Sequence, residues 1–374
     1  MLGIKPLVNV DLLSVRKDRI EYHGSQNLAS QVRLSLYKTE QSQKQSKDQK
    51  PKIQNHFYMK PTILTVLLTM ATFVGVQAQT MIAVQGDTGS SFYASLDTAI
   101  VKAHAGDYIY LPGGNFTVSK PIDKKLHIVG VGFNPDSCIA TRITQVTGSF
   151  TIKKGSDHGS MTGMKIGGGF TFSLSTGESL NYFSIERCDI GSDVNLATKS
   201  SQILISECVL NGSVYGNSSQ GFQLTKCIVS GNVYGFIANS FADNNVFLGG
   251  SFGGCFFRNN IFLSYVASPD PSNTTVFQNN SFRSTVSSLY NCHNNIVASS
   301  TDLFKNNQDY HVLATSAAHN AGTDGTDLGI YGTSSPWKEG SLPGNPHIQK
   351  VQSKTVSTID GKLEVKTNIA AQDY

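Results

Sequence analysis

The stretch Ile185-Glu186-Arg187-Cys188-Asp189-Ile190 carries a pattern that returns until Val297 and decides the fold. We count the pattern from an index position, which is held in turn by Cys188, Cys208, Cys227, Asn245, Asn260, Asn280 and Asn295. Successive index residues are 20, 19, 18, 15, 20 and 15 positions apart. The residues three places before and two places after the index are apolar in every copy.

A repeat of this length cannot bury its apolar face alone, and it gains a core only by stacking on the next copy. Inward positions five and three places before the index alternate with outward ones, and this period of two is typical of strands. The abundance of Asn, Gly and β-branched residues argues against paired helices. We therefore expect an all-β protein, a right-handed single-stranded parallel β-helix with coils about 4.8 Å apart.

The index residues should form a ladder along the solenoid axis. Asn suits this place because it tolerates a left-handed bend between two strands, and because its amide can hydrogen-bond to the Asn above and below. A second register supports the solenoid, since three glycine-bounded segments begin 19 residues apart. These segments are Gly212–Gly216, Gly231–Gly235 and Gly250–Gly254.

The first 78 residues are expected to lie outside the fold. Residues 1–58 are polar and show no sustained periodicity, so we interpret them as a disordered upstream extension. Residues 59–78 combine Lys60, an apolar run from Ile63 to Val76 and the Val76-Gln77-Ala78 end, which is typical of a secretory signal peptide. The alternative is a signal anchor behind a cytoplasmic tail. The first interpretation predicts a secreted or cell-surface protein without a transmembrane segment in the mature chain.

Removing this end changes the charge balance. The whole chain has 30 Lys and Arg against 26 Asp and Glu. Of these, 11 basic and 5 acidic residues lie in residues 1–78, which leaves 19 against 21, a net charge of −2. The remaining chain has no basic stripe with interleaved aromatic residues, so we expect no nucleic-acid partner.

The β-helix is expected to span residues 79–348. Apolar residues at helical spacing within Ser95–Gly106 predict an N-terminal capping helix, and Asp107–Leu111 should be the first strand. After Val297, we expect Asp309–Leu313 and Gly322–Gly332 to close the ladder and the proline-rich segment 334–347 to wrap the solenoid. Residues 349–374 are expected to form a tail or a short hairpin.

Several of these segments resemble one family. The Gly106–Gly114 opening, the Asn and Cys ladder, the Asp309–Leu313 strand and the Ala321–Gly332 end are similar to secreted right-handed parallel β-helix proteins of the pectin-lyase-like superfamily. The resemblance covers residues 84–348 and is to the type common in Bacteroidetes. It implies a fold but not one activity, because the superfamily includes polysaccharide lyases, glycoside hydrolases and tailspike-like binders.

Six Cys in a secreted chain would normally indicate disulfides. Cys188, Cys208 and Cys227 share the index ladder, where neighbouring Cβ atoms should lie about 4.8 Å apart rather than the ~3.8 Å of a disulfide. We expect stacked, buried and reduced thiols. No closely spaced Cys pair is present among them, so no metal site is predicted.

Residues four and two places before the index should point outward. On adjacent coils this places Phe241 beside Phe256 and Asp243 beside Arg258. Sugar rings stack on aromatic faces, and charged groups bind hydroxyls or uronates, so these four residues and Glu186 are the predicted ligand-binding residues. The alternative is that loops cover the rings and that Asp243 and Arg258 form an ordinary surface ion pair.

The preferred hypothesis is a scaffold that binds polysaccharide or another surface polymer without catalysis and without a cofactor. The alternative is a polysaccharide lyase or glycoside hydrolase acting on an acidic polysaccharide, with Arg258, Asp243 and His293 as catalytic candidates and Ca²⁺ as the cofactor of a lyase. Glu186 and Asp243 should lie three coils apart, roughly 14 Å, which disfavours a hydrolase. A third hypothesis is an assembly module that docks through Val351–Tyr374.

Overall fold

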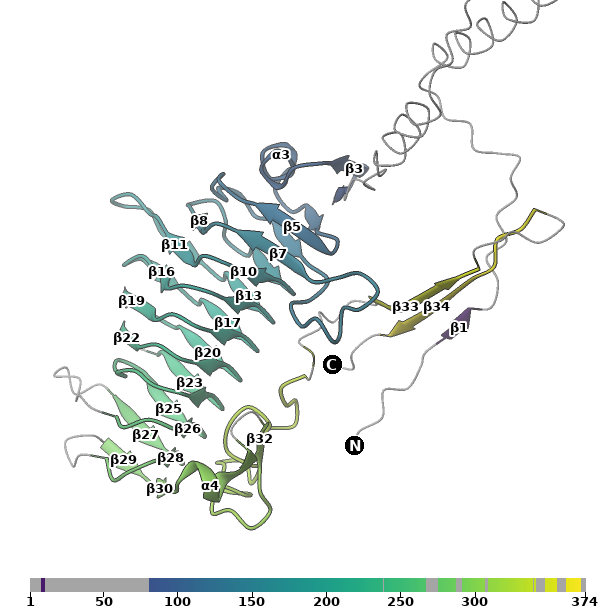
Figure 1. Cartoon of the computed structure of the whole chain (residues 1–374). Coiled ribbons are helices and arrows are strands. Elements are labelled where there is room, and N and C mark those ends of the chain that lie inside the picture. Colours follow the sequence, from purple (N-terminus) through teal and green to yellow (C-terminus); the bar gives the residue numbers. More distant parts are fainter. Residues whose placement is uncertain are drawn as a thin grey trace, which may run out of the picture. The chain divides into compact units, whose positions relative to one another are not determined.

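The fold is known from a computed structural model, which describes residues 8–10, 81–237, 239–266, 275–286, 291–306, 309–338, 340, 347–354 and 361–370. Within these residues the regular structure is almost all strand, with helices α3 (Leu96–Lys102) and α4 (Ser300–Leu303). Parallel strands stack into a β-solenoid, so the predicted all-β parallel β-helix is confirmed (Figure 1). The predicted signal peptide, residues 59–78, lies outside the described residues, and of residues 1–58 only Val8–Val10 is described.

The longest sheet of the described chain has twelve strands and contains the segment of each coil that precedes the index residue. Its strands, in spatial order, are β29 (Asn291–His293), β27 (Val276–Gln278), β25 (Phe256–Arg258), β23 (Phe241–Asp243), β20 (Gln223–Thr225), β17 (Leu204–Ser206), β13 (Ser184–Glu186), β9 (Ser160–Thr162), β6 (His127–Val129), β4 (Tyr108–Tyr110), β2 (Ile82–Gly86) and β3 (Gly89–Tyr93). We call it the long sheet.

A second sheet, of ten strands, contains the segment that follows each index residue. Its strands are β30 (Ile296–Val297), β28 (Ser281–Phe282), β26 (Ile261–Phe262), β24 (Val246–Phe247), β21 (Ile228–Val229), β18 (Val209–Leu210), β14 (Asp189–Ile190), β10 (Lys165–Ile166), β7 (Thr144–Thr147) and β5 (Gly114–Thr117).

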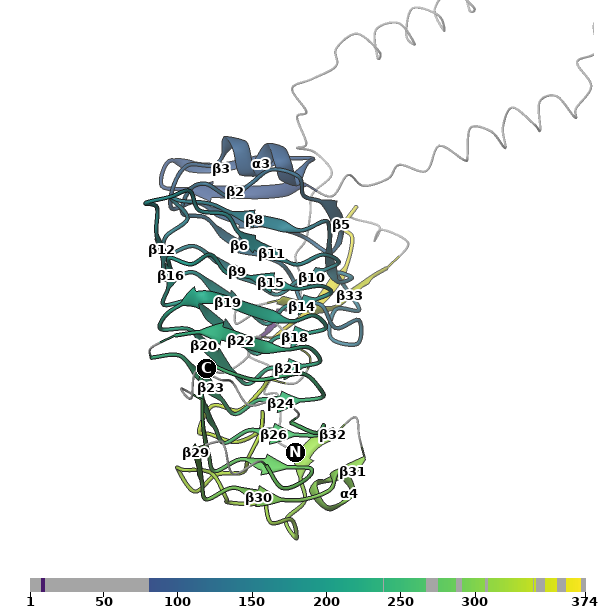
Figure 2. The same cartoon turned by 90° about the vertical axis from the view of Figure 1, so that its left-hand side faces the viewer.

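A third, five-stranded sheet completes the coils of the middle region (Figure 2). Its strands are β22 (Val233–Phe236), β19 (Val214–Ser219), β15 (Val194–Asn195), β11 (Phe170–Phe172) and β8 (Phe150–Ile152). β19 and β22 are the strands predicted from the glycine-bounded segments. A short pair, β12 (Leu180–Asn181) and β16 (Ser200–Ser201), lies at one turn of neighbouring coils.

Inward side chains from the three sheets form one core. Like residues stack from coil to coil, because each inward residue lies directly above its counterpart in the next copy. The rings of Phe247 and Phe262 are parallel with centroids 4.7 Å apart, and Phe262 continues the stack to Phe282 at 4.8 Å. All three side chains are buried, so aromatic stacking runs along the axis in this half of the solenoid.

The index ladder is held by a repeated set of hydrogen bonds. The Oδ1 of Asn260 accepts from the backbone N–H of Asn245 (2.8 Å) and from its Nδ2 (2.9 Å). The Nδ2 of Asn260 donates to the carbonyl of Ala242 (2.8 Å) and to the Oδ1 of Asn280 (2.9 Å). The side chain of Asn260 is fully buried, so the predicted Asn-to-Asn hydrogen bonds are confirmed.

The left-handed bend, however, is not at the index position. It lies one place earlier, where φ is between 51° and 58° in all seven copies. These residues are Arg187, Glu207, Lys226, Asn244, Asn259, Asn279 and Asn294. The predicted reason for Asn at the index was therefore wrong in part: Asn is needed there for its hydrogen bonds, and the left-handed residue precedes it.

The N-terminal end of the solenoid has the predicted helix and also an unpredicted hairpin. Helix α3 begins after Ser95, whose Oγ accepts from the N–H of Thr98 (3.4 Å), and it buries Leu96 and Ile100 in the core. β4 matches the strand predicted at Asp107–Leu111, but it is not the first. β2 and β3 precede it and extend the long sheet with antiparallel pairing. The repeat pattern does not predict these two strands, because they are not part of a repeat.

The predicted closing strands after Val297 do not continue the ladder. β32 (Asp309–Val312) pairs antiparallel with β31 (Phe304–Asn306) in a separate two-stranded sheet, and residues 322–332 form no strand. Separately, β33 (His347–Ser353) and β34 (Val365–Ala370) are neighbours in a three-stranded sheet, where β1 (Val8–Val10) pairs antiparallel with β34. The interpretation of residues 1–58 as a disordered upstream extension stays a prediction, and so does that of residues 349–374 as a tail or a short hairpin.

We predict that replacing Asn260 by Ala destabilises the protein by roughly 2–4 kcal/mol, because it leaves buried donors and acceptors on both neighbouring coils without partners. Urea unfolding followed by circular dichroism measures the change. Asn115→Ala is the control, since Asn115 is exposed on β5 and should change stability little. Equal effects of the two substitutions would contradict the role of the ladder.

Candidate functional site

The outer surface of the long sheet is the most regular surface of the described chain. The parallel register aligns outward residues in two columns. The first column is Tyr108, His127, Ser160, Ser184, Leu204, Gln223, Phe241, Phe256, Val276 and Asn291; the second is Tyr110, Val129, Thr162, Glu186, Ser206, Thr225, Asp243, Arg258, Gln278 and His293. We call this surface the long-sheet face.

Four of the predicted ligand-binding residues come together on β23 and β25. Phe241 pairs with Phe256, and Asp243 pairs with Arg258, in the register of the two strands. The phenyl centroids are 6.2 Å apart, and the guanidinium carbon of Arg258 lies 5.9 Å from the Phe241 centroid and 6.0 Å from the Phe256 centroid. Arg258 is thus in cation–π range of both rings. We call these four residues the Arg258 cluster.

Arg258 also holds Asp243 with two hydrogen bonds. Its Nη2 lies 2.6 Å from Oδ2, and its Nε donates to Oδ1 at 3.2 Å. The Arg258 side chain is 38% exposed and that of Asp243 is 23% exposed. The predicted ion pair is present. The rings, expected to be exposed, are half-buried.

The electrostatics of the pair follow from its partial burial. Burial raises the pKa of Asp243, and the hydrogen bonds and charge of Arg258 offset part of that rise. The hydrogen bond to Asp243 raises the pKa of Arg258, and the charge of Asp324 adds to this effect. Arg258 therefore stays cationic. A carboxylate whose two oxygens face a guanidinium is poorly placed to accept a substrate proton.

The other predicted site residues lie apart from this cluster. Glu186 is aligned with Asp243 but three strands away along the long sheet, roughly 14 Å at the strand spacing. His293 lies two strands beyond Arg258, with Gln278 between them, roughly 10 Å away. The structure thus brings together Asp243 and Arg258 but adds neither Glu186 nor His293. No pair of these carboxylates has the separation of about 5–9.5 Å used by glycosidases.

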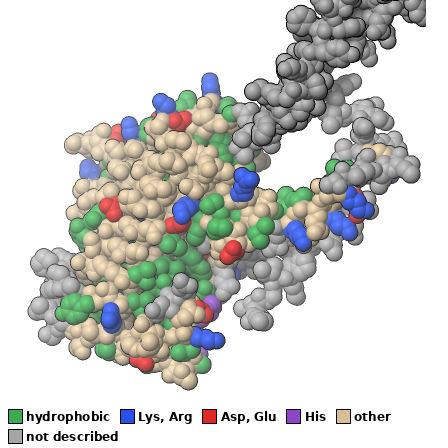
Figure 3. Space-filling model, viewed as in Figure 1, with side chains coloured by type: hydrophobic (Ala, Val, Ile, Leu, Met, Phe, Trp, Pro, Cys, Tyr) green, Lys and Arg blue, Asp and Glu red, His purple; other side chains and the backbone are tan. Residues whose placement is uncertain are grey.

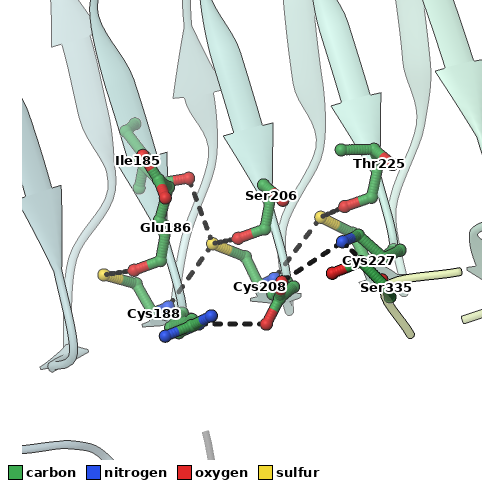
Figure 4. Close-up of polar contacts among 11 residues, drawn as sticks. Ile185, Glu186, Cys188, Ser206, Cys208, Thr225, Cys227 and Ser335 are labelled. Carbon is green, nitrogen blue, oxygen red and sulfur yellow. Dashed lines mark hydrogen bonds and ion pairs between the residues drawn. The ribbon is translucent and has the colours of Figure 1, made fainter. Parts of the chain in front are cut away.

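The Cys part of the index ladder is built as predicted (Figure 4). Cys188, Cys208 and Cys227 are free and fully buried. The Sγ atoms of Cys208 and Cys227 accept from the N–H of the preceding index residue at 3.4 Å, in the role that Oδ1 has where the index is Asn. Burial raises the pKa of the Cys188 and Cys208 thiols well above the usual value, so these thiols stay protonated and unreactive.

Sequence reasoning missed a buried ion cluster beside the Cys ladder. Glu207 lies between Arg187, whose Nε is 3.0 Å from Oε2, and Lys226, whose Nζ is 3.3 Å from Oε1. The side chains of Arg187, Glu207 and Lys226 are only 12%, 9% and 14% exposed, respectively. Lys226 also donates to the carbonyl of Ser335 at 2.8 Å. All three charged residues occupy the left-handed place before the index.

Ser335 belongs to a C-terminal segment that covers the second sheet, which we call the arm (residues 318–337). The arm runs back along the left-handed corner. The Nδ2 of Asn279 donates to the carbonyl of Ala321 (2.9 Å), and Asn259 exchanges hydrogen bonds with Thr323 (2.9 and 3.1 Å). The N–H of Gly329 donates to the carbonyl of Asn259 at 2.8 Å. The wrapping contacts thus begin earlier than predicted, near residue 318, and the described ones reach Trp337. Most of the rest of the predicted wrapping segment 334–347, residues 339 and 341–346, lies outside the described residues.

Apolar contacts also hold the arm. Residues one place after the index point outward from the second sheet, and two of them, Val246 and Ile261, are fully buried. They form a second core with Leu328, Ile330 and Trp337 of the arm. A sequence signal existed for this contact: an outward place on an exposed sheet is expected to be polar, whereas Val209, Ile228, Val246, Ile261 and Ile296 are apolar.

Charged side chains are scattered over the side of the molecule drawn in Figure 3, and no basic stripe is visible there. Within the described ranges, no group of three or more His, Cys, Asp or Glu is placed to hold a metal ion. No helix in that same part of the chain is long and apolar enough to cross a membrane. No protein-family model and no curated protein matches the chain.

We predict that Arg258→Met raises the pKa of Asp243 further. The Met side chain keeps most of the packing against the rings but removes the hydrogen bonds and charge that lower this pKa, which leaves the effect of burial. An NMR titration of the carboxyl carbons measures the pKa. Asp309, whose pKa is lowered by hydrogen bonds with His311, is an internal control that should not move. An unchanged or lower Asp243 pKa would show that the ion pair is not formed in solution.

We also predict that, at concentrations at which the chain is a monomer, one thiol of the native protein reacts with a thiol reagent well before the other five. Cys292 is exposed, whereas the other five Cys are buried. Counting labelled thiols by mass spectrometry, before and after unfolding in guanidinium, should give one and then six. Cys292→Ser should abolish the fast reaction. Fast labelling of Cys188, Cys208 or Cys227 in the native protein would contradict the buried ladder.

Proposed function

We propose that the protein is a secreted or cell-surface β-helix scaffold that binds an extended polysaccharide, or another surface polymer, on the long-sheet face without catalysis. The observation that carries the proposal is the Arg258 cluster, where two half-buried rings flank a partly exposed guanidinium. Aromatic rings stack on sugar rings, and a guanidinium donates to hydroxyl or carboxylate oxygens. The regular columns on either side offer polar groups at each step of about 4.8 Å.

The family and the location are part of this proposal. The parallel β-solenoid supports the β-helix part of this proposal. A place among the pectin-lyase-like β-helix proteins, of the type common in Bacteroidetes, rests on the resemblance of segments such as Gly106–Gly114 and Ala321–Gly332. Secretion rests on the signal-like residues 59–78. The proposed partner is the polymer alone, without nucleic acid and without a cofactor.

The alternative is a polysaccharide lyase that uses Arg258 as the base, with Asp243 and His293 beside it and Ca²⁺ on the substrate carboxylate. The raised pKa of Arg258 and the distance to His293 both weigh against this chemistry. A non-catalytic interaction needs neither a neutral guanidinium nor His293 in the cluster.

Binding is tested with a panel of neutral and acidic polysaccharides, by affinity electrophoresis and then by calorimetry for any that bind. We expect Phe241→Ala plus Phe256→Ala to weaken binding by about tenfold or more, the loss of one or two stacking contacts. Tyr234→Ala is the matched control, because Tyr234 is an exposed aromatic residue on β22, outside the long-sheet face.

The same samples are followed by ultraviolet absorbance with and without Ca²⁺. Absorbance from unsaturated products that grows with time and disappears in Arg258→Ala would establish the lyase and overturn the scaffold. Binding that the Tyr234 variant and the double Phe variant lose equally would place the site elsewhere. An absence of binding across the panel would count against the polysaccharide proposal itself.

A further inference from the structure

The two ends of the solenoid differ. At the N-terminal end, helix α3 and strand β2 bury the inward residues, with Ile82, Leu96 and Ile100 each at most 1% exposed. At the C-terminal end, β29 and β30 are the terminal strands of the long and second sheets, and no further described strand pairs with them (Figures 1 and 2). Only the N-terminal end of the described solenoid is therefore capped.

Inward positions of the last coil are exposed where their counterparts are buried. Cys292 lies under Phe277 in the register of the long sheet, yet Cys292 is exposed and Phe277 is fully buried. In the second sheet, Val297 is 58% exposed while Phe282, its neighbour on the preceding coil, is 2% exposed. The core thus reaches the surface at this end.

The surface near Val297 is also hollowed. An open cavity of about 450 Å³ is lined by Val297, Ala298, Leu313 and Ala317 together with polar side chains of and around α4. The lining is thus mixed, with apolar groups at Val297, Ala298, Leu313 and Ala317 and polar groups at Thr301, Asp302, Thr315 and Ser316. In the long sheet, β29 has an edge with which no further described strand pairs. Soluble proteins usually block such an edge with charges or proline. β29 contains neither, since its sequence is Asn291-Cys292-His293.

Within the part of the chain that the structure describes, backbone groups at this edge also lack the inter-coil partners that their counterparts have. In earlier coils the residue before the index donates its N–H to the next coil, as Asn279 does to the carbonyl of His293 (3.0 Å). The index residue donates its N–H to the next index side chain, as Asn280 does to Asn295 (2.8 Å). For Asn294 and Asn295 there is no next coil within the described residues. Their N–H groups can be satisfied by a docked chain.

From these observations we propose that two copies of this chain associate end to end, with β29 of one copy pairing antiparallel with β29 of the other. Because the core is capped at the N-terminal end, a continuous core can form only between two C-terminal ends. Two identical edges that meet in this way are related by a two-fold axis, and the interface closes on itself. An axis normal to the long sheet keeps inward side chains inward in both copies.

The residue types on β29 are compatible with this arrangement. With the axis at Cys292, the two Cys292 residues face each other, and each Asn291 lies opposite His293 of the other copy. The paired strands contain no Asp, Glu, Lys or Arg, so no like charges of these residues meet. Directly opposed residues of antiparallel strands have Cα atoms about 4.5–5.5 Å apart. The Arg258 cluster lies two strands away, so both copies would present their long-sheet faces on one continuous sheet.

The first test is the mass of the purified full chain in solution, measured by light scattering during gel filtration over a series of concentrations. We expect twice the monomer mass for the wild-type chain and for Cys292→Ser under reducing conditions. Cys292→Asp and Cys292→Lys should each give the monomer mass, because like charges would meet at the axis. An equimolar mixture of these two variants should restore the doubled mass.

The controls separate the interface from general effects. Thr171→Asp places the same charge at an exposed position of β11 and should leave the doubled mass unchanged. Because association stabilises the folded chain, unfolding in urea is compared at a concentration at which the wild-type chain is also a monomer. There the Cys292 variants should unfold at the same urea concentration as the wild-type chain, since Cys292 is exposed. A short bis-maleimide should link two wild-type chains through Cys292, and no linked pair should form with Cys292→Ser.

A monomeric wild-type chain at every concentration would overturn the proposal. So would a doubled mass that survives both charged substitutions, because a different surface would then hold the pair. A ladder of increasing masses would point to head-to-tail stacking and would overturn the two-fold arrangement.

Discussion

The hydrogen bond between the index N–H of one coil and the index side chain of the next sets the geometry of the solenoid. Both Asn Oδ1 and Cys Sγ can accept it, which explains why the ladder changes from Cys to Asn at Asn245 without a break: the N–H of Cys227 donates to Oδ1 of Asn245 at 2.8 Å. Because every coil must present this acceptor at the same place, coils of different lengths keep one register. Variation in length is confined to the turns.

That strict register explains what could be predicted from the sequence. Strands, columns and the meeting of Phe241 with Phe256 and of Asp243 with Arg258 all follow from counting positions relative to the index. The left-handed place could not be found by the same counting, since Arg, Glu, Lys and Asn all occupy it. Residue type alone does not predict that a residue with a long polar side chain, such as Arg187, adopts a positive φ.

Features outside the repeat were the ones missed. The β2–β3 hairpin and the arm occur once each, so no periodic signal marks them. The apolar outward residues of the second sheet did carry information about the arm. Apolar residues fill five of the seven places directly after the index, whereas the long-sheet column that runs from Glu186 to His293 is polar throughout. The solenoid therefore has one side that packs against Trp337 and Ile330 of the arm, and another side that carries the partly exposed Arg258 cluster.

The arm also limits how this solenoid can change length during evolution. A β-solenoid can gain or lose whole coils by duplication or deletion, because each coil contacts only its neighbours. Here the arm forms hydrogen bonds to Asn279, Asn259 and Lys226 in turn, so its length matches a fixed number of coils. A coil added before Arg187 would not change the spacing between those three anchoring residues. A coil added between Lys226 and Asn279 would leave the arm too short, so length variation among relatives should be concentrated in the N-terminal half.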